Sequence, residues 1–222
     1  MREKSLESVD VVCERLAKQR DAAIQYTVFL RDVTKPERWY KYGNSLSGHM
    51  INLQIVAVEN ALVLWASRVW DESRDAQSIP KAFLAVSQNI RKIIRRRSKD
   101  WDAQLQEEWT RKQFLSYREL NTEYLRLAES PVRNVVRVLR SENLAHLLAF
   151  SDDRRRLFPE GFDQHGVIRN DLFDFVESCI RLIDRIELFR VGHSRNFDES
   201  AAVFQSYCDA YWGAVPVFRE VE

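Results

Sequence analysis

The sequence contains few of the residues that interrupt helices, with 6 Gly and 5 Pro among 222 residues. It also has almost no runs of alternating apolar and polar residues, which would indicate strands, whereas apolar residues recur at helical spacing over long stretches. Hydrophobic residues make up 45% of the chain, which excludes a disordered protein. The sequence therefore predicts one all-α domain over residues 1–222, a multi-helix bundle with long antiparallel helices.

Cysteine is scarce as well. The three cysteines, Cys13, Cys179 and Cys208, are odd in number and lie far apart in the sequence. Disulfide frameworks and cysteine-based metal sites require pairs of cysteines at short intervals. We therefore expect three reduced thiols in the core, no bound metal and no cofactor.

The sequence has no segment that is typical of a secretory signal or a membrane span. The first ten residues, MREKSLESVD, are polar, whereas a signal peptide requires an apolar segment. The most apolar stretch, residues 50–70, contains five residues that are costly in a bilayer: Asn52, Gln54, Glu59, Asn60 and Arg68. We expect a cytoplasmic protein without membrane contact, in which residues 50–70 form a central helix buried by several neighbours.

Lysine is the scarce basic residue, because 26 of the 34 basic residues are Arg and only 8 are Lys. The net charge of +1 excludes a protein that attracts nucleic acid with its whole surface, so any basic function must be local. Arginine binds carboxylate or phosphate with two parallel hydrogen bonds, and the bias permits a phosphate or RNA site. Ion pairs on helix surfaces are the more common use of such residues.

Apolar periodicity, caps and helix breakers predict seven helices. They cover residues 5–31, 46–70, 79–99, 102–129, 130–150, 171–191 and 199–213. A short aromatic link over residues 36–43 separates the first two helices. Asn170 is expected to cap the first of the last two helices and Gly192 to close it, and the cap of the final helix is expected near Asp198.

The densest positive run lies at the end of the third predicted helix. It comprises Arg91, Lys92, Arg95, Arg96, Arg97 and Lys99, and Trp101 follows. Such a run can follow a phosphate backbone while the aromatic ring stacks on a base, so Arg95, Arg96 and Arg97 are candidate RNA-binding residues. The alternative is a solvated helix end, where cations face the negative pole of the helix dipole.

The clearest helix covers residues 130–150, SPVRNVVRVLRSENLAHLLAF. Ser130 can cap its start, and Pro131 suits its first position. Its apolar face carries four aliphatic residues and then two polar ones: Val132, Val135, Val136, Leu139, Asn143 and His146. A second row, of Arg133, Arg137 and Arg140, lies beside this face and predicts a basic edge that ends where the polar pair begins.

Two segments of the chain resemble a known family. The stretch LRSENLAHLLAFSD resembles the Arg-x(four to six)-His motif of the HEPN superfamily, all-α domains many of which act as metal-independent RNases in toxin–antitoxin, abortive-infection and other defence systems. The sequence of this stretch and that of residues 62–83, LVLWASRVWDESRDAQSIPKAF, are similar to the abortive-infection U-type (AbiU-like) branch. The resemblance implies a HEPN-like fold, RNA as the substrate, a homodimer and a cognate antitoxin protein as a further partner.

The resemblance also implies roles for individual residues. The neighbouring 2′-OH of the RNA would attack the phosphate and leave a cyclic phosphate, with His146 as general acid or base. Arg140 would neutralise the charge that builds on the phosphate, and Asn143 would position the phosphate or orient the imidazole. The supporting residues would be Ser141, Glu142 and Glu59, of which Glu142 lies one helical turn before His146.

The geometry of a single helix separates the two principal residues. Arg140 and His146 have five residues between them, and on a regular helix this places them about 120° apart around the axis. A two-fold interface repeats every contact, so two copies of this helix would bring such residues into one shared pocket. A homodimer is therefore part of the hypothesis.

Three other interpretations remain open. Ser141 stands where active HEPN proteins commonly carry Asn, Asp or His, which indicates a catalytically inactive RNA- or protein-binding module, antitoxin-like or scaffold in kind. In such a module aromatic residues would recruit the partner: Trp39, Tyr40, Trp101 and Trp109. A nucleotide-binding regulatory domain is the second interpretation. In the third, His146 is a hydrogen-bonded packing residue, and Arg140 forms an ion pair with Glu142 or Glu59.

Overall fold

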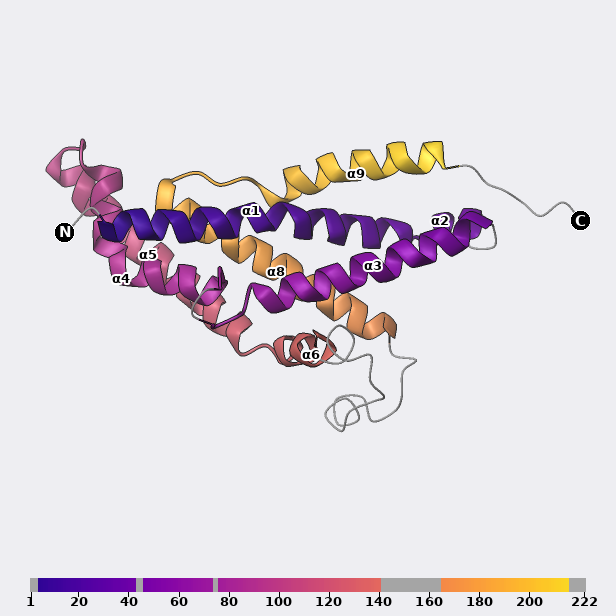
Figure 1. The fold of residues 1–222 in the computed structure, drawn as a ribbon. Helices are drawn as coiled ribbons and strands as arrows, with labels where there is room; N and C mark the ends of the chain where they lie inside the picture. The colour runs from indigo at the N-terminus through magenta and orange to yellow at the C-terminus, as the bar shows by residue number, and fades with distance from the viewer. Residues whose placement is uncertain (1–3, 43–45, 74–75, 141–164, 216–222) are drawn as a thin grey trace, which may run out of the picture.

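The computed structural model describes residues 4–42, 46–73, 76–140 and 165–215. Within these ranges the chain forms eight helices and no strand, which confirms the all-α prediction (Figure 1). The helices are α1 (Lys4–Val33), α2 (Pro36–Tyr42), α3 (Leu46–Arg68), α4 (Ile79–Ser98), α5 (Ala103–Ala128), α6 (Pro131–Leu139), α8 (His165–Val191) and α9 (Phe197–Ala214).

Helix α1 is the centre of the bundle and packs against α3, α4, α8 and α9. Helices α3 and α8 run in the opposite direction to α1, and α9 lies along its other side (Figure 1). Helix α5 packs against α8 and α4, while the short α6 packs against α3 and α8. The structure therefore confirms a multi-helix bundle with long antiparallel helices.

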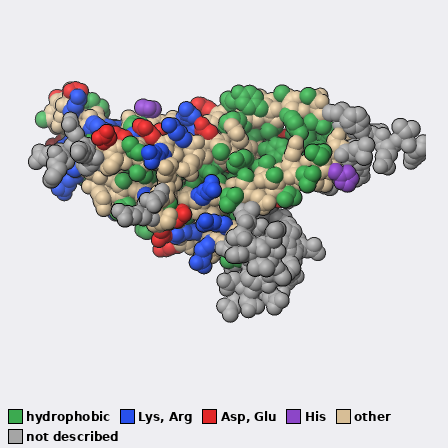
Figure 2. Space-filling model, viewed as in Figure 1, with side chains coloured by type: hydrophobic (Ala, Val, Ile, Leu, Met, Phe, Trp, Pro, Cys, Tyr) green, Lys and Arg blue, Asp and Glu red, His purple; other side chains and the backbone are tan. Residues whose placement is uncertain are grey.

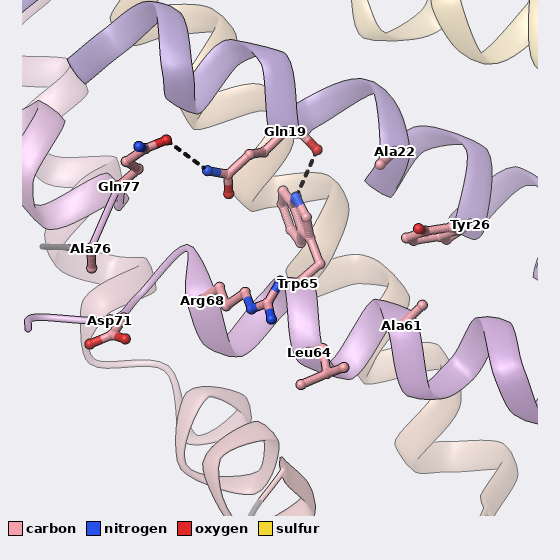
Figure 3. A pocket seen from close by; sticks show the side chains of 10 residues that line it. All are labelled: Gln19, Ala22, Tyr26, Ala61, Leu64, Trp65, Arg68, Asp71, Ala76 and Gln77. Atoms are coloured by element: carbon pink, nitrogen blue, oxygen red, sulfur yellow. Dashed lines mark hydrogen bonds between the residues drawn. The ribbon is translucent and has the colours of Figure 1, made fainter. Parts of the chain in front are cut away.

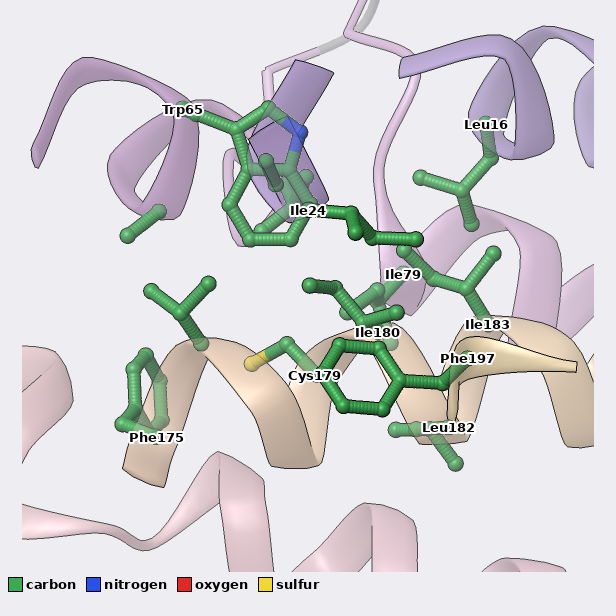
Figure 4. Close-up of a cluster of buried hydrophobic side chains, with 14 of the residues drawn as sticks. Leu16, Ile24, Trp65, Ile79, Phe175, Cys179, Ile180, Leu182, Ile183 and Phe197 are labelled. Atoms are coloured by element: carbon green, nitrogen blue, oxygen red, sulfur yellow. The ribbon is translucent and has the colours of Figure 1, made fainter. Parts of the chain in front are cut away.

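The core forms where α1, α3, α4 and α8 meet, and Figure 4 shows its centre. Leu16 and Ile24 of α1 face Cys179, Ile180 and Ile183 of α8 across this region. Each of these side chains is at most 3% exposed. Burial on this scale contributes roughly 1.5–3 kcal/mol per large aliphatic side chain. Long helices with continuous apolar faces therefore gain enough stabilisation from burial to form the bundle.

The cysteines are free, as predicted. Burial raises the pKa of the Cys13 and Cys179 thiols to about 12, so both are protonated at neutral pH. Trp70 donates its indole N–H to the sulfur of Cys179 at 3.2 Å. Cys208 is only partly buried. Cys13 and Cys179 thus behave as small core residues rather than as reactive thiols.

The link after α1 and the start of α8 differ from the prediction. The aromatic link is itself helical, because Pro36 occupies the first position of α2, where its missing N–H is no loss. Asn170 lies inside α8, which begins at His165, so Asn170 is not its cap. The cap of α9 is Asn196, whose side chain accepts a hydrogen bond from the Asp198 N–H at 2.9 Å. Gly192 closes α8 with φ 91°, as predicted.

Helix α3 is buried over only part of its length. Its C-terminal half is covered, but Met50, Leu53 and Val56 are 60%, 65% and 55% exposed. The prediction of a helix buried by several neighbours was wrong for the N-terminal half, because α1 covers one side of it and no described helix covers the other. Figure 2 shows hydrophobic side chains gathered over this half of α3 and over α9.

Residues Ser47–Arg68 of α3 are long and apolar enough to cross a membrane by length and composition alone. They make up one such segment within the residues described above. Core helices of soluble proteins and signal sequences meet the same criterion, so a single segment of this kind is weak evidence for a membrane span.

Candidate functional site

The predicted site is centred on the C-terminal end of α6. Arg140 ends that helix as its C-cap, whereas Ser141, Glu142, Asn143 and His146 lie outside the described residues. The structure therefore shows the surface on which the predicted motif begins, and it places Arg140 on that surface.

Helix α6 starts as its sequence predicts. Ser130 is the N-cap in an extended conformation and Pro131 follows, although the Ser130 hydroxyl makes no capping hydrogen bond. Val136 is 2% exposed against the rest of the bundle. Burial of this face turns Arg133, Arg137 and Arg140 toward the edge of the helix, where they lie one turn apart.

These three arginines line a single cavity of about 400 Å³ between α6 and the C-terminal end of α3. We call this cavity the arginine cleft. Its other lining residues come from α3, the link that follows α3, and α6: Ala66, Ser67, Trp70, Asp71, Glu72, Asn134 and Val136. The volume lies within the range of small-molecule sites, roughly 300–1,000 Å³.

Arg140 lies at the rim of the arginine cleft. It donates a hydrogen bond to the Ser67 hydroxyl at 3.3 Å, and its side chain remains exposed. Asp71 lies on the opposite wall, where it accepts a hydrogen bond from the Ser73 N–H at 2.8 Å. That bond, then the Ser73 hydroxyl and the charges of Arg140 and Lys81, hold the pKa of Asp71 below its ordinary value. The cleft thus contains both charged donors and an ionised acceptor.

Arg133 is fixed in place, unlike Arg140. It pairs with Glu72 at 2.6 Å and donates to the Ala128 carbonyl at 3.1 Å, while its guanidinium lies 5.2 Å above the Trp70 ring. Trp70 in turn stacks on Tyr124, with ring centroids 5.8 Å apart. Arg133 therefore builds the wall of the cleft, because most of its hydrogen-bonding capacity is used within the protein.

The basic run of α4 lies elsewhere and has other contacts. Arg96 pairs with Asp10 at 2.9 Å, and Arg97 donates to the Phe189 carbonyl at 2.8 Å while its guanidinium lies 4.8 Å from the Trp109 ring. Arg95 is exposed. The structure does not bring this run to the arginine cleft, and its role in binding RNA stays a prediction.

Glu59 also stays apart from the cleft. It lies half-buried in the middle of α3, two helical turns before Ser67, and is not among the lining residues. Its predicted supporting role is therefore not visible in the described geometry.

The residues opposite the arginines were not among the sequence-predicted site residues. Ser67, Trp70, Asp71 and Glu72 all belong to residues 62–83, the segment that carried the second part of the family resemblance. The family resemblance of that segment indicated that its residues could matter for function. Nothing in the sequence showed that the segment lies against α6. The structure supplies this connection, because α3 and α6 pack together.

The arrangement can bind an anion but offers no metal site among the residues the structure describes, where no group of three or more His, Cys, Asp or Glu residues is placed to hold an ion. Arg140 is a charge-assisted donor at the rim, and a phosphate held there would receive its hydrogen bonds. Ser67 adds a hydroxyl group to the cleft. The ionised Asp71 repels an anion, so an anion would bind away from that carboxylate.

Comparison with known proteins identifies the family. No curated protein and no solved structure matches the chain. The family model HEPN AbiU2, described as AbiU2, matches residues 9–211, which include every described helix segment from α1 to most of α9. The match therefore covers both walls of the arginine cleft as well as the Arg140 to His146 motif. The chain belongs to the AbiU2 family, in the AbiU-like branch of the HEPN superfamily.

Proposed function

We propose that the protein is a HEPN-like defence or toxin-type endoribonuclease of the cytoplasm, which cleaves RNA without a metal through a dimeric Arg-x5-His site. The observation that carries the proposal is the arginine cleft, where Arg133, Arg137 and Arg140 line one cavity at the start of the motif. Family membership supports a defence module of HEPN type. The proposal adds the reaction and the residues.

In the proposed reaction the 2′-oxygen bonds to phosphorus, and the bond from phosphorus to the 5′-oxygen breaks. His146 of one copy removes the 2′-OH proton, and His146 of the other donates a proton to the departing 5′-oxygen. Arg140 neutralises the charge that grows on the phosphate. Electrostatic stabilisation of this kind by preorganised donors is usually the largest single contribution to catalysis. Asn143 orients the phosphate or the imidazole, with Ser141, Glu142 and Glu59 as supporting residues.

Binding of the RNA strand would fall to the exposed arginines. Arg137 and Arg140 are exposed at the rim of the cleft, so they are the donors assigned to the phosphates. Arg133 shapes the wall. Of the run on α4, Arg95 is the exposed member assigned to the strand, since Arg96 and Arg97 hold other groups of the protein.

The homodimer in this proposal is supported by an exposed apolar face. Leu53 on α3 and Val203 and Tyr207 on α9 are 65%, 50% and 63% exposed. Tyr207 also lines a groove of about 470 Å³ between α1, α3 and α9, and hydrophobic side chains gather over α3 and α9 in Figure 2. Large exposed apolar patches mark protein–protein contacts. A second copy is the proposed occupant, and a cognate antitoxin protein would compete for the same face.

The test is RNA cleavage in the presence of EDTA, with purified wild-type protein beside His146→Ala and Arg140→Ala. We expect wild-type protein to release fragments that end in a 2′,3′-cyclic phosphate. Both variants should lose at least a hundredfold in rate, since general acid–base catalysis alone contributes about 10²–10⁴-fold. His193→Ala and Arg118→Ala change exposed residues outside the site and serve as matched controls. Equal cleavage by wild type and His146→Ala would refute the catalytic proposal.

A second candidate function is a catalytically inactive RNA- or protein-binding module, and Ser141 is the observation that favours it. Under this alternative the arginine cleft binds RNA without cleaving it. Tyr40 and Trp101, which are 87% and 43% exposed, are aromatic residues available for a partner protein. Retention of RNA by wild-type protein with no cleavage product over the full assay would support it.

A further inference from the structure

A second cavity, of about 630 Å³, lies beside the arginine cleft and is shown in Figure 3. It is bounded by α1 on one side and by α3 with the α3–α4 link on the other. Its lining residues are Gln19, Ala22, Tyr26, Ala61, Leu64, Trp65, Arg68, Asp71, Ala76 and Gln77. The proposed cleavage chemistry uses none of them.

The walls of this cavity are apolar and fixed. Trp65 is 6% exposed and donates its indole N–H to the Gln19 carbonyl at 2.8 Å, which holds its ring between α1 and α3. Ala22 and Ala61 contribute only methyl groups from the two facing helices, so they leave the space open. The half-buried ring of Tyr26 closes the far end. Such walls suit a flat, mainly apolar ligand.

One end of the cavity is polar. The Gln19 amide donates to the Gln77 amide oxygen at 3.4 Å, and this long bond leaves further donors and acceptors of both amides for a ligand. Asp71 adds an ionised acceptor. The Arg68 side chain is exposed and makes no hydrogen bond or ion pair with any residue in the described parts of the chain. A flat ligand with donors and acceptors on its edge matches this arrangement.

The cavity lies next to the arginine cleft and has one lining residue in common with it. Asp71 lines both cavities. Arg68, in the second cavity, directly follows Ser67, which receives the hydrogen bond from Arg140 in the first. The two cavities therefore flank the same end of α3, one rich in arginine and the other apolar with a polar edge. A single polymer with alternating phosphates and flat bases fits both at once.

We propose that this second cavity binds one nucleobase of the RNA strand whose phosphate lies in the arginine cleft, and that it gives the protein a base preference at that position. Single-stranded RNA is recognised through unstacked bases that lie against aromatic side chains and are hydrogen-bonded along their edges. Gln19, Gln77 and Asp71 read the edge of the base, and Arg68 contacts the phosphate that joins the two cavities. The proposal rests on RNA being the substrate of the proposed function.

The first test measures binding and needs no cleavage. The four nucleoside 5′-monophosphates and ribose 5-phosphate are titrated into the wild-type protein by calorimetry, because ribose 5-phosphate has the same phosphate and no base. We expect at least one nucleotide to bind tenfold or more tightly than ribose 5-phosphate. In Ala22→Phe, where the added ring fills the cavity, this ratio should fall to about one. Ala202→Phe, on the exposed surface of α9, should retain it.

A smaller change guards against a variant that fails to fold. Gln77→Ala removes an edge-reading amide and fills no space, so it should change which of the four nucleotides binds most tightly. Gln88→Ala, at an exposed position of α4, should not. A wild-type ratio of about one would overturn the proposal. So would an Ala22→Phe protein with a wild-type circular dichroism spectrum and an unchanged ratio.

A second arm distinguishes a strand from a free nucleotide. A trinucleotide RNA should bind at least tenfold more tightly than the best monophosphate, and Arg140→Ala should remove this gain. Equal binding of the two ligands would overturn the strand assignment. His146→Ala should retain all base discrimination, so a protein that discriminates bases but never cleaves RNA would refute the proposed function alone.

Discussion

Two groups of arginines in this protein have opposite surroundings. The group on α4, residues 95–97, is the denser in sequence, yet two of its three members contact carboxylates, backbone carbonyls or an aromatic ring of the same chain. The group on α6 is spread over two helical turns and lines an open cavity. Density of charge in a sequence therefore does not indicate which cations are available to a ligand.

The physical reason lies in what each group faces. The C-terminal carbonyls of α8 and the Asp10 carboxylate of α1 lie against the end of α4, and these acceptors hold Arg96 and Arg97. Arg190, only 5% exposed, joins the same network through Asp10 at 2.8 Å. At the arginine cleft Glu72 pairs with Arg133, while Arg140 donates to the Ser67 hydroxyl and stays exposed. The following changes test this contrast, beginning with the largest effect.

Replacement of Arg97 should cost the most stability. Arg97→Ala removes donors to two carbonyls of α8 and the contact with the Trp109 ring, so we expect a loss of about 2–3 kcal/mol in the free energy of unfolding. Arg95→Ala, next to it and exposed, should change this quantity by less than about 0.5 kcal/mol. Urea denaturation followed by circular dichroism measures both. Similar losses in the two variants would break the contrast between them.

Asp10 should contribute stability that depends on pH. Burial would raise the pKa of Asp10, but hydrogen bonds from Arg96 and Arg190 and their charges outweigh it, so the pKa lies below its ordinary value. A lowered folded-state pKa means stability that is present above the unfolded value of about 4 and is lost as pH falls through the folded value. Asp10→Asn should therefore cost about 2 kcal/mol at pH 7.

The difference between wild type and Asp10→Asn should begin to shrink as the pH falls below about 5, since Asp10 of the unfolded chain takes up a proton around its ordinary pKa of about 4. It should go on shrinking down to the lower pKa of folded Asp10. Denaturation midpoints at several pH values measure it. Asp100→Asn changes an exposed carboxylate and should give a difference near zero throughout. A difference between wild type and Asp10→Asn that stays constant with pH would mean that folding does not shift the pKa of Asp10.

Gly192→Ala should have a smaller cost. Gly192 has φ 91°, where a side chain adds strain, and an added methyl carbon would lie 2.8 Å from the Arg97 guanidinium. We expect a loss of about 1–2 kcal/mol. The double variant with Arg97→Ala should lose less than the sum of the two single variants, because the contact no longer exists. Gly213→Ala, which meets no atom within 4 Å, is the control.

The smallest effect on folding belongs to the arginine cleft. Arg137→Ala and Arg140→Ala should each weaken RNA binding about tenfold, or about 1.4 kcal/mol, and lower the salt dependence of log K by about one phosphate contact. Their unfolding free energies should stay within about 0.5 kcal/mol of wild type. Arg118→Ala, at an exposed position of α5, should bind RNA normally. An unchanged affinity in both cleft variants would exclude the cleft as the RNA site.

The two halves of α3 likewise show that apolar periodicity does not predict which residues become buried. The sequence indicated an apolar helix, which is correct, but its N-terminal half carries exposed Met50 and Leu53. A helix that is apolar on all sides is expected to be covered, but its sequence does not say which element covers it. The prediction that other helices of the same chain would cover the whole of α3 was therefore wrong for this half.

The sequence predicted the end of a helix correctly where only one nearby residue suited that position. Gly192 was identified as the end of α8 because a positive φ favours glycine. Asn170 was wrong as a cap, and the cap of α9 was placed only as near Asp198, since several polar residues near each end can accept the free N–H groups. Asn196, two residues before Asp198, does so in the structure.

The sequence by itself determined the fold class, the apolar faces of the helices and the family, because helical periodicity and the motif around Arg140 are local properties of the chain. Only the tertiary structure decided which arginines remain at an open surface and which residues lie across from them. Those outcomes depend on acceptors far away in sequence, such as Asp10 for Arg96 and Ser67 for Arg140. Such pairings arise from packing, which no local pattern encodes.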